Sequence, residues 1–474
     1  MKVYEQHGMY VAGAWRPAAT DESTDVVNPA DERVIATVPA GTAHDVDAAV
    51  AAARTAFPGW ATTAPAERAA ALTALGCELR ARVREFAETI TAELGSPLAL
   101  SRLAHVRTPL AVLDSYAELA GRHPFEERIG RSTVLLEPVG VVGAITPWNY
   151  PLHQMVSKVA PALAAGCTIV VKPAEETPLT ARLLAECVAA AGLPPGVFNL
   201  VTGVGEVAGR ALAEHPDVDM VSFTGSTAVG KEVAAHAART IRRVALELGG
   251  KSPNVILPSA DHTTAVRTGV TNVFTNSGQT CSAWTRMLVH RSRYEEAVTL
   301  AADAAAAYAP GDPLDPATRM GPLVSARQRA RVRDCIRRGI KEGARLVTGG
   351  PEAPDGLPRG YFARPTIFAD VTPDMSVAQE EIFGPVLSIM KYEDKDDAVR
   401  MANHSVYGLS GAVWSAETPE AVAFARRLNT GQVDINGARF NPLAPFGGWK
   451  QSGIGRELGR HGLMEYLQTK SLQV

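Results

Sequence analysis

The chain is poor in cysteine, carries little net charge and has no long apolar run. Its five cysteines, at positions 77, 167, 187, 281 and 335, include no C-x-x-C pair and no neighbouring histidine cluster. This spacing predicts neither a disulfide framework nor a metal site. Free thiols favour a reducing compartment, so we expect a cytoplasmic protein in which four of the five cysteines are buried as small apolar residues.

The weak charge and the short apolar runs exclude two further classes. A formal net charge of −3 gives no basic field of the kind that holds nucleic acid. The longest apolar stretch, 159–171, is interrupted by Pro161 and Gly166 and is too short to cross a bilayer as a helix. The N-terminal residues lack the charge and apolar pattern of a secretory signal. We therefore expect neither nucleic acid nor membrane among the partners.

A repeated alternation of apolar patterns is present instead, in a chain whose 474 residues predict two or three domains. From about residue 165, short β-branched runs alternate with Ala-rich amphipathic stretches, which is typical of βαβ units. The expected strands are 167–172, 197–201, 220–223 and 243–248, with helices at 178–191 and from about 205 and 226. These units predict an open, doubly wound sheet.

A second alternation follows Gly249-Gly250. It predicts strands at 254–257 and 287–290 and helices at 262–275, 294–308 and 325–341, with further pairs up to Ile435. This half is therefore also expected to be α/β. We interpret the glycine pair as a hinge or crossover between two domains, because glycine allows backbone angles closed to other residues.

Two segments outside these alternations are expected to be extended. Residues 121–138, which include the run Ser132-Thr-Val-Leu-Leu136, predict a ribbon, and residues 463–474 have a similar pattern. Exposed strand edges are usually paired, so a partner subunit is the expected neighbour. The predicted fold class is α/β, with two doubly wound Rossmann-like domains and a small β ribbon for oligomerisation.

Two glycine-rich turns follow expected strands. The segment Gly225-Ser-Thr-Ala-Val-Gly-Lys231 is similar to a phosphate-binding P-loop, but Glu232 stands where that motif needs Ser or Thr. The segment 203–209 is one residue too long for the usual dinucleotide fingerprint. Backbone N–H groups in either turn can meet a pyrophosphate. A tight turn without a ligand explains each segment equally well.

Three polar residues are singled out by their neighbours. Cys281 lies in the polar segment 276–281, where a thiol can be partly ionised and reachable for nucleophilic catalysis. Glu247 ends an apolar strand, where burial would raise its pKa toward that of a general base. A salt-bridged strand end is the alternative. Asn149 lies between Pro147 and Pro151, so its amide can be held toward an oxyanion, or it is an ordinary turn asparagine.

Seven motifs, taken together in their order and spacing, favour the functional interpretation of these residues over the purely structural one. They are Ile145-Thr-Pro-Trp-Asn-Tyr-Pro151, Val171-Lys-Pro-Ala-Glu175, Phe223-Thr-Gly-Ser226, Leu246-Glu-Leu-Gly-Gly-Lys251, Gly278-Gln-Thr-Cys281, Glu380-Glu-Ile-Phe-Gly-Pro385 and Pro445-Phe-Gly-Gly-Trp-Lys450. In these motifs the chain resembles the aldehyde dehydrogenase superfamily, from roughly Val11 to Leu472. The resemblance implies an enzyme that oxidises an aldehyde to a carboxylic acid with NAD(P)⁺.

The resemblance also implies roles for the reactive residues. Cys281 would attack the aldehyde carbonyl, and the Asn149 side chain with the Cys281 N–H would hold the oxyanion. After hydride transfer to the nicotinamide, water activated by Glu247 would hydrolyse the thioester. Lys158 and Glu457 match positions that relay protons from this base, with a surface or domain-contact charge as the alternative interpretation.

For the cofactor, the resemblance assigns Lys172 and Glu175 to the adenosine ribose and Glu381 and Phe383 to the nicotinamide ribose. Further matching cofactor positions are Ile145, Thr146, Pro147, Trp148, Gly205, Phe223, Gly225, Ser226 and Leu248. A carboxylate at position 175 accepts hydrogen bonds from two ribose hydroxyls and repels a 2′-phosphate. NAD is therefore expected to be preferred over NADP.

The substrate is a small-molecule aldehyde in this interpretation. The family's substrate tunnel matches Tyr150, Gln154, Ser157, Thr280, Ser282 and Phe440. Gln154 and Ser157 stand where many relatives carry larger apolar or aromatic side chains. This difference predicts a roomier, more polar tunnel that admits a bulky or functionalised aldehyde.

The domain limits implied by the resemblance are an NAD-binding domain at 1–120 and 139–249, a catalytic domain at 250–450, and oligomerisation segments at 121–138 and 451–474. A homodimer or homotetramer is expected. One alternative is a CoA-acylating aldehyde dehydrogenase, which generally lacks the base that Glu247 supplies. The other is a non-catalytic NAD-binding or structural protein on the same fold, and the joint presence of Cys281, Glu247 and Asn149 counts against it.

Overall fold

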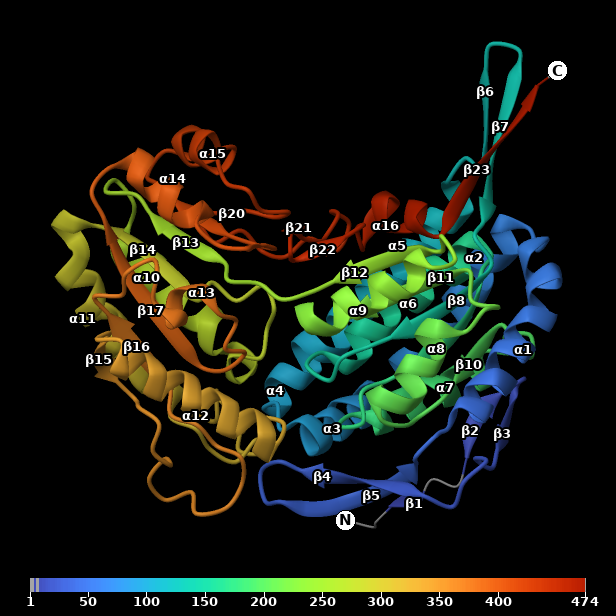
Figure 1. The fold of residues 1–474 in the computed structure, drawn as a ribbon, viewed down its shortest axis with the longest axis horizontal. Coiled ribbons are helices and arrows are strands. Elements are labelled where there is room, and N and C mark those ends of the chain that lie inside the picture. The colour runs from blue at the N-terminus through green and yellow to red at the C-terminus, as the bar shows by residue number, and fades with distance from the viewer. Residues whose placement is uncertain (1–3, 6–7, 474) are drawn as a thin grey trace.

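The computed structural model describes residues 4–5 and 8–473, which form two α/β lobes joined by extended segments (Figure 1). The first lobe is built on an eight-stranded sheet in the order β22-β12-β11-β8-β9-β10-β2-β3. The strands are β22 (Gly453–Ile454), β12 (Arg243–Glu247), β11 (Met220–Thr224), β8 (Val141–Ile145), β9 (Thr168–Lys172), β10 (Phe198–Leu200), β2 (Met9–Val11) and β3 (Ala14–Arg16). The five strands from β12 to β10 run parallel, as the sequence pattern predicts.

The strand order of this sheet reverses between β8 and β11. The chain leaves β8 toward β9 and β10 on one side, and later leaves β11 toward β12 on the other. In open α/β sheets, ligands bind outside the carboxyl ends of the strands at such a switch point. The segments that begin there are Thr146–Asn149 after β8 and Gly225–Ser226 after β11.

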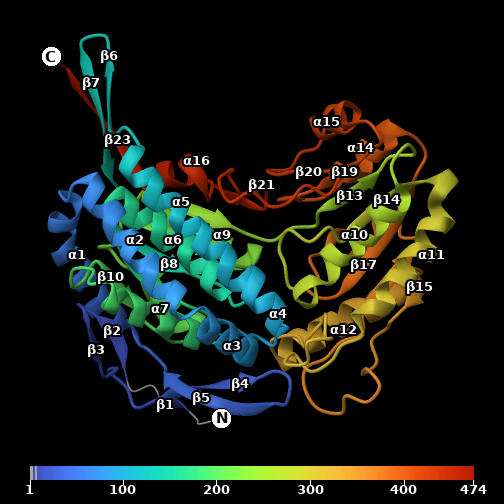
Figure 2. The same ribbon diagram turned by 180° about the vertical axis from the view of Figure 1, so that it is seen from behind.

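Helices cover both faces of the first sheet (Figures 1 and 2). They are α1 (Ala43–Ala61), α2 (Pro65–Ala81), α3 (Val83–Leu94), α4 (Leu98–Leu100), η1 (Ser101–Arg107), α5 (Thr108–Arg122), α6 (Pro151–Ala165), α7 (Pro178–Ala190), η2 (Gly205–Gly209), α8 (Arg210–Glu214), α9 (Thr227–Ala238) and α16 (Gly459–Glu465).

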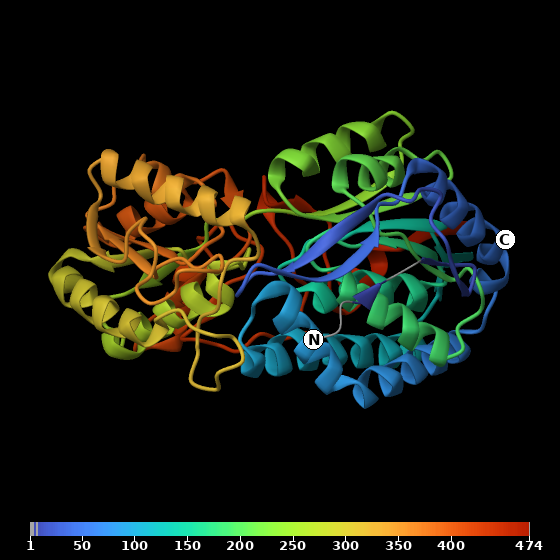
Figure 3. The ribbon, with the colours of Figure 1, turned by 90° about the horizontal axis from the view of Figure 1, so that it is seen from below.

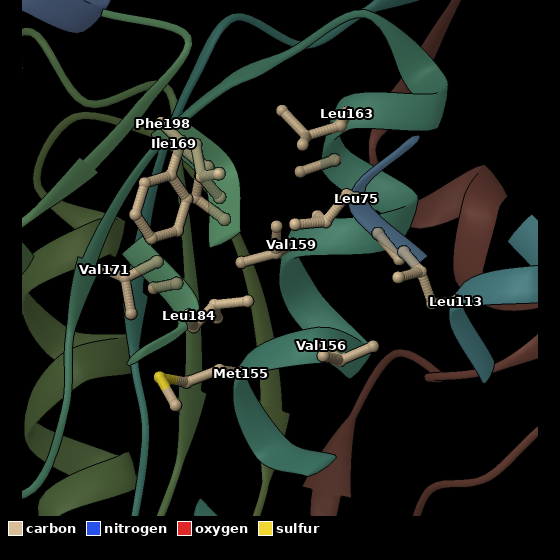
Figure 4. Close-up of a cluster of buried hydrophobic side chains, with 14 of the residues drawn as sticks. Leu75, Leu113, Met155, Val156, Val159, Leu163, Ile169, Val171, Leu184 and Phe198 are labelled. Atoms are coloured by element: carbon tan, nitrogen blue, oxygen red, sulfur yellow. The ribbon is translucent and has the colours of Figure 1, made fainter. Parts of the chain in front are cut away.

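Helix α6 lies at the centre of this lobe, and all of its residues except His153 are buried. Figure 4 shows Met155, Val159 and Leu163 of α6 among the side chains of β9, α2, α5 and α7. The helix starts at Pro151, whose fixed φ suits a first turn, and ends at Gly166 with a left-handed φ of 96°. Packing on all sides makes α6 a rigid support for the polar residues of its first turns.

The second lobe is built on a seven-stranded sheet in the order β15-β16-β17-β14-β13-β19-β20. The strands are β15 (Arg345–Thr348), β16 (Thr366–Ala369), β17 (Val386–Tyr392), β14 (Arg286–His290), β13 (Pro253–Ile256), β19 (Ala412–Trp414) and β20 (Asp434–Ile435), and the helices are α10 (His262–Phe274), η3 (Thr275–Gly278), η4 (Arg291–Arg293), α11 (Tyr294–Ala305), η5 (Ala306–Tyr308), α12 (Ala326–Lys341), α13 (Ser376–Gln379), α14 (Lys395–Asn403) and α15 (Thr418–Ala425). All neighbours in this sheet pair in parallel except β15 with β16. The second half is therefore α/β, as predicted.

A small N-terminal sheet lies below the first lobe in the view of Figure 1 and faces the viewer in Figure 3. It consists of β1 (Tyr4–Glu5), β5 (Arg33–Pro39) and β4 (Ser23–Asn28). Its β4–β5 turn reaches the second lobe, because Gly360 N donates to Glu32 Oε1 at 2.9 Å and Tyr361 N donates to Pro29 O at 2.8 Å. A two-stranded sheet, β18 (Tyr407–Gly408) with β21 (Trp449–Lys450), lies on the opposite side near the lobe junction.

The expected ribbon is present, but its edges are paired differently from the prediction. Strands β6 (Glu126–Ile129) and β7 (Ser132–Pro138) form a hairpin that projects from the body, and β23 (Leu467–Gln473) pairs along β7 within the same chain. The expectation that a partner subunit pairs both edges was therefore wrong for the edge between β7 and β23.

The C-terminal segment also differs from the prediction. Residues 463–465 belong to helix α16 and are not extended, and this helix packs so closely on α5 that a Cβ at Gly462 would collide with the Tyr116 hydroxyl. Residues 453–454 form β22, which pairs with β12 at the edge of the first sheet, so only the last strand of 451–474 belongs to the ribbon.

Two sequence-level exclusions concern the described part of the chain. Within residues 4–5 and 8–473, no helix is long and apolar enough to cross a membrane. The same residues contain no group of three or more His, Cys, Asp or Glu side chains placed to hold a metal ion. The expectation for the cysteines was wrong at one position, because Cys77 is exposed on α2 while Cys167, Cys187 and Cys335 are buried.

Candidate active site

The loop that carries Cys281 begins with a left-handed turn. Asn276, Ser277 and Gly278 have φ values of 54°, 57° and 74° in succession. Such angles are costly for residues with a side chain, and a Cβ at Gly278 would collide with the Gly384 carbonyl. The Ser277 hydroxyl donates to Gly321 O at 2.8 Å and helps to hold the turn. The turn redirects the chain after α10 so that Cys281 meets the first lobe.

Two asparagines join this loop to the segment after β8. The Asn149 amide donates to Gln279 O at 3.0 Å, and the Asn276 amide donates to Asn149 O at 2.8 Å. All three residues are buried. The Asn149 side chain is therefore fixed beside the cysteine loop by a reciprocal pair of hydrogen bonds across the lobe junction.

A cavity of about 240 Å³ opens beside Cys281. Its lining residues are Ala104, Thr108, Tyr150, His153, Gln154, Thr280, Cys281, Ser282, Phe440, Phe446, Glu457 and Leu458. The Tyr150 hydroxyl lies 2.9 Å from Thr280 Oγ1, and its ring stacks on His105 with centroids 4.6 Å apart. This cavity is the candidate substrate pocket.

Gly249 and Gly250, between the lobes, are needed because other parts of the chain approach their backbone closely. Neither Gly249 nor Gly250 has a positive φ, so the expectation that they supply unusual backbone angles was wrong. A Cβ at Gly249 would instead collide with the Glu381 carboxylate, and one at Gly250 would collide with the Cys281 carbonyl. The pair is small because the cysteine loop and Glu381 pack directly on this backbone.

Buried carboxylates surround Cys281. Burial raises the pKa of the Cys281 thiol well above its ordinary value, and the nearby Glu381, Glu247 and Glu457 raise it further. The prediction of a partly ionised thiol was therefore wrong, because a raised pKa favours the neutral thiol. The reason is the apolar junction and the negative neighbours, which the local polar sequence does not reveal.

Glu247 is buried at the end of β12, and its Oε2 has no hydrogen-bond partner within the described part of the chain. Burial raises its pKa well above the ordinary value, and Glu457 raises it further, while Lys158 and Arg456 act in the opposite direction. The direction agrees with the expectation from the sequence. A Cβ at Gly447, in the Pro445-Phe-Gly-Gly segment, would approach Glu247 Oε1 to 2.6 Å, so this glycine makes room for the carboxylate.

Lys158 and Glu457 form a buried ion pair. Lys158 Nζ lies 2.5 Å from Glu457 Oε1 and 2.7 Å from Thr224 Oγ1. The Lys158 side chain is 0% exposed and that of Glu457 is 8% exposed. The interpretation of these two residues as surface charges is therefore wrong, because both lie inside the first lobe beside the pocket.

A groove of about 180 Å³ lies beside the carboxyl ends of β12 and β11. It is lined by Thr227, Gly230, Lys231, Ala234, Leu246, Leu248, Lys450, Gln451, Gly453 and Ile454. The N-terminus of α9 borders it, and the Ser226 hydroxyl caps this helix by accepting from Val229 N. Gly205 begins η2 after β10, and a Cβ there would meet nothing within 4 Å, so the backbone is open to a ligand.

The remaining expected cofactor residues fall into two groups. Lys172 is buried at the end of β9, and its Nζ lies 3.5 Å from Glu175 Oε2. On the other side, the Gly250 N–H donates to Glu381 Oε1 at 3.0 Å, and burial raises the pKa of Glu381 to about 7. Phe383, with a φ of 60°, packs edge-on against Trp148 at 5.3 Å across the junction.

The structure separates one expected tunnel residue from the rest. Tyr150, Gln154, Thr280, Ser282 and Phe440 line the pocket, but Ser157 does not, because it lies on the fully buried side of α6. The small Ser157 side chain therefore does not itself widen the pocket.

Sequence reasoning missed other members of the site. His153 and Phe446 line the pocket, and Asn276 holds the Asn149 main chain. The signal for His153 was available, since it is a polar residue within a helix that is otherwise mostly apolar. Asn276 precedes a serine and a glycine, a sequence that suits left-handed turns.

The fold and the site define a class of protein, namely a two-lobed α/β protein with a cysteine at the wall of a cavity and a groove beside the N-terminus of α9. The chain belongs to the aldehyde dehydrogenase family, whose model matches residues 15–472. Members of this family oxidise aldehydes to carboxylic acids with NAD(P)⁺.

Individual relatives cover almost the whole chain. It is 48% identical over 472 residues to a 3-succinoylsemialdehyde-pyridine dehydrogenase from a Pseudomonas species, covering 98% of this chain and 97% of the relative. Aldehyde dehydrogenase C from Pseudomonas syringae, solved with NAD⁺ and octanal, superposes with a TM-score of 0.98 at 46% identity, covering 99% of this chain and 96% of that one. An NAD⁺ complex of a Mycobacterium tuberculosis aldehyde dehydrogenase gives 0.98 at 45% identity, with 100% and 99% coverage.

Proposed function

We propose that this enzyme oxidises an aldehyde through a thioester on Cys281. The observation that carries the proposal is the position of Cys281 at the wall of a cavity, with the Asn149 amide bonded to the cysteine loop at Gln279 O and with Glu247 and Glu457 close enough to raise the pKa of the thiol. Cys281 Sγ attacks the carbonyl carbon, and the thiol proton passes to a neighbouring base. The negative oxygen of the resulting hemithioacetal is held by the Asn149 amide and the Cys281 N–H.

The second half-reaction belongs to Glu247. NAD⁺, when bound, supplies the acceptor for the two electrons and the hydrogen that leave the substrate carbon. Glu247 then takes a proton from a water molecule, whose oxygen attacks the thioester carbon. The C–S bond breaks, the carboxylic acid leaves and Cys281 is restored. Lys158 and Glu457 pass the proton on from Glu247, a role supported by their buried, paired positions beside it.

The residues around the groove fit a dinucleotide. The N-terminus of α9 suits a pyrophosphate and the apolar side chains Leu246 and Leu248 suit adenine, while the open backbone at Gly205, outside the groove's lining, offers a second place for the ligand. Glu381 and Phe383 would hold the nicotinamide ribose, and Thr146 to Trp148 would border the nicotinamide. Lys172 and Glu175 would hold the adenosine ribose.

We infer a preference for NAD from Glu175. Its carboxylate is already paired with Lys172, and a further carboxyl, Glu176, lies beside it. A 2′-phosphate would add two negative charges next to these acids. The test is kcat/KM with NAD and NADP for the wild type and for Glu175→Gln. We expect NAD to be preferred and the preference to shrink in the variant; equal efficiency with both cofactors in the wild type would refute the assignment.

For the substrate, we propose a bulky or functionalised aldehyde. Gln154 lines the pocket and gives its wall a polar group that an aldehyde would contact. Small side chains, such as those of Ala104 and Thr108, leave space at the same wall. The names of the relatives agree with this size, since one acts on a pyridine-bearing semialdehyde and another was solved with octanal.

Domain roles and assembly follow the same assignment. We propose NAD binding by 1–120 and 139–249, catalysis by 250–450, and oligomerisation through 121–138 and the C-terminal strand, as a homodimer or homotetramer. The outer edges of the β6-β7-β23 sheet support this role, because each offers unpaired backbone groups. Free thiols support a reducing, cytoplasmic location.

One experiment tests the reaction against its alternatives. Purified enzyme is offered NAD and a panel of aldehydes, with and without CoA, and the absorbance of NADH and the identity of the acyl product are recorded. We expect NADH and a free carboxylic acid without CoA. An acyl-CoA product would favour the CoA-acylating alternative, and no NADH from any aldehyde would favour a non-catalytic protein.

A further inference from the structure

Two polar side chains of the pocket each have a buried atom with no hydrogen-bond partner among the residues that the structure describes. Gln154 is only 7% exposed and its Oε1 makes no hydrogen bond, and the buried Nδ1 of His153 makes none either. Both residues lie in the first turns of α6, whose packing fixes their backbone. Buried polar groups are normally satisfied, so unpaired ones in a cavity wall point to a ligand that supplies the partner. Rotating either side chain toward such a ligand breaks no existing hydrogen bond.

The charge around these groups restricts the ligand. Among the described residues that line the cavity there is no Lys or Arg, and Glu457 is the carboxylate on its wall. The nearest lysine on the same helix, Lys158, is already paired with Glu457. His153 adds no cation, because burial lowers its pKa to about 4. A substrate carboxylate would therefore meet no counter-charge here and would face a like charge.

The remaining walls are aromatic. The His153 and Phe440 rings meet edge to face at 6.2 Å, and Phe440 meets Phe446 in the same way at 6.5 Å. Such walls suit a ring or a flat chain, while the amide and imidazole offer both donors and acceptors.

We propose that His153 and Gln154 are specificity-determining residues that select an uncharged aldehyde carrying a hydrogen-bonding heteroatom, such as a ring nitrogen, a ketone or a hydroxyl, and that disfavour aldehydes carrying a carboxylate. The proposal rests on the proposed function of the Cys281 pocket as an aldehyde site. It names the substrate class that this pocket takes.

The test compares three aldehydes of one shape: benzaldehyde, pyridine-3-carbaldehyde and 3-carboxybenzaldehyde. Values of kcat/KM are measured for the wild type, His153→Leu and Gln154→Met. Met155→Leu is the matched control, since Met155 lies on the same helix but packs into the core (Figure 4). Ratios between variants cancel differences in intrinsic reactivity of the aldehydes. Thermal unfolding and NAD binding are recorded for each variant as controls for folding.

We expect the pyridine-to-benzaldehyde ratio to fall by about tenfold in His153→Leu or Gln154→Met and to stay at the wild-type value in Met155→Leu. The carboxylated aldehyde should be the poorest wild-type substrate, and Gln154→Arg should improve it. Unchanged ratios in both variants, or a wild type that prefers the carboxylated aldehyde, would overturn the proposal. The absence of NADH with every aldehyde would instead overturn the proposed function itself.

Discussion

The buried polar groups on the two sides of Cys281, the proposed cofactor side and the substrate pocket, differ in how burial changes their protonation near neutral pH. On the cofactor side, burial raises the pKa of Glu381 to about 7 and that of Glu247 well above its ordinary value. On the substrate side, burial lowers the pKa of His153 to about 4 and raises that of Tyr150 to about 12. The same physical cause thus raises the pKa of these carboxyl groups, that of Glu381 to near neutral pH, and keeps the His153 and Tyr150 side chains neutral there. In the proposed mechanism, one side moves protons and the other recognises an uncharged substrate.

The largest loss of activity is expected from replacing the Cys281 thiol, which lies between the proposed cofactor side and the substrate pocket. Cys281→Ser should lower kcat at least about 10³-fold, because a serine hydroxyl is a far weaker nucleophile in this carboxylate-rich site. NADH formation measures the loss, and calorimetric NAD binding shows whether the cofactor side is intact. Cys77→Ser, at the exposed cysteine on α2, is the control and should keep wild-type activity. Substantial turnover by Cys281→Ser would remove the thiol from the mechanism.

The next effect separates proton transfer from acylation. Glu247→Gln keeps the shape of the side chain but cannot accept a proton, so steady-state turnover should fall about 10²–10⁴-fold. Stopped-flow absorbance should still show a first burst of NADH equal to the enzyme concentration, because the thioester forms but is not hydrolysed. If Glu247→Gln turns over at the wild-type rate, Glu247 is not the general base and another group activates the water.

A third change tests the charged pair that borders both sides. Lys158→Met leaves Glu457 buried without its partner, which should destabilise the protein by about 3–5 kcal/mol. The measurement is the midpoint of thermal unfolding. The double variant Lys158→Met with Glu457→Gln removes both charges and should recover much of the loss. If the single and double variants unfold alike, the pair contributes nothing beyond its packing.

The smallest effect is the pH dependence. Cys281 and Glu247 both have raised pKa values, and both act in their deprotonated forms. Protonation therefore inactivates them at low pH, and because both pKa values are raised, kcat/KM should still be rising as the pH increases above neutral. His153 stays neutral across this range and should add no step of its own. Activity that falls with rising pH would contradict the assignment of both groups.

Much of the fold was predictable because its signals are local. Buried parallel strands such as β9 and β13 are short β-branched runs, and helices such as α10 and α12 follow amphipathic patterns. These patterns arise from backbone periodicity and burial, which neighbouring residues report. The motif spacing also predicted the family and brought Cys281, Glu247 and Asn149 to attention.

The parts that were missed depend on residues distant in sequence. The helix at 459–465 forms where Gly462 meets Tyr116, and β23 pairs with β7 more than 300 residues away. Ser157 and Gln154 are three positions apart on α6, yet only Gln154 reaches the pocket. Which face of a fully buried helix meets a cavity cannot be seen from its own pattern, because both faces are covered.

By itself, the sequence determined the two α/β halves and the family and pointed to the candidate reactive groups, since local periodicity and motif spacing encode them. Only the tertiary structure decided the protonation of those groups and the shape of the pocket. Desolvation and the approach of Glu381, Glu247 and Glu457 raise the pKa of the Cys281 thiol, and these carboxylates come from three separate segments of the chain. Electrostatics depends on distance through space, and that distance is set by packing.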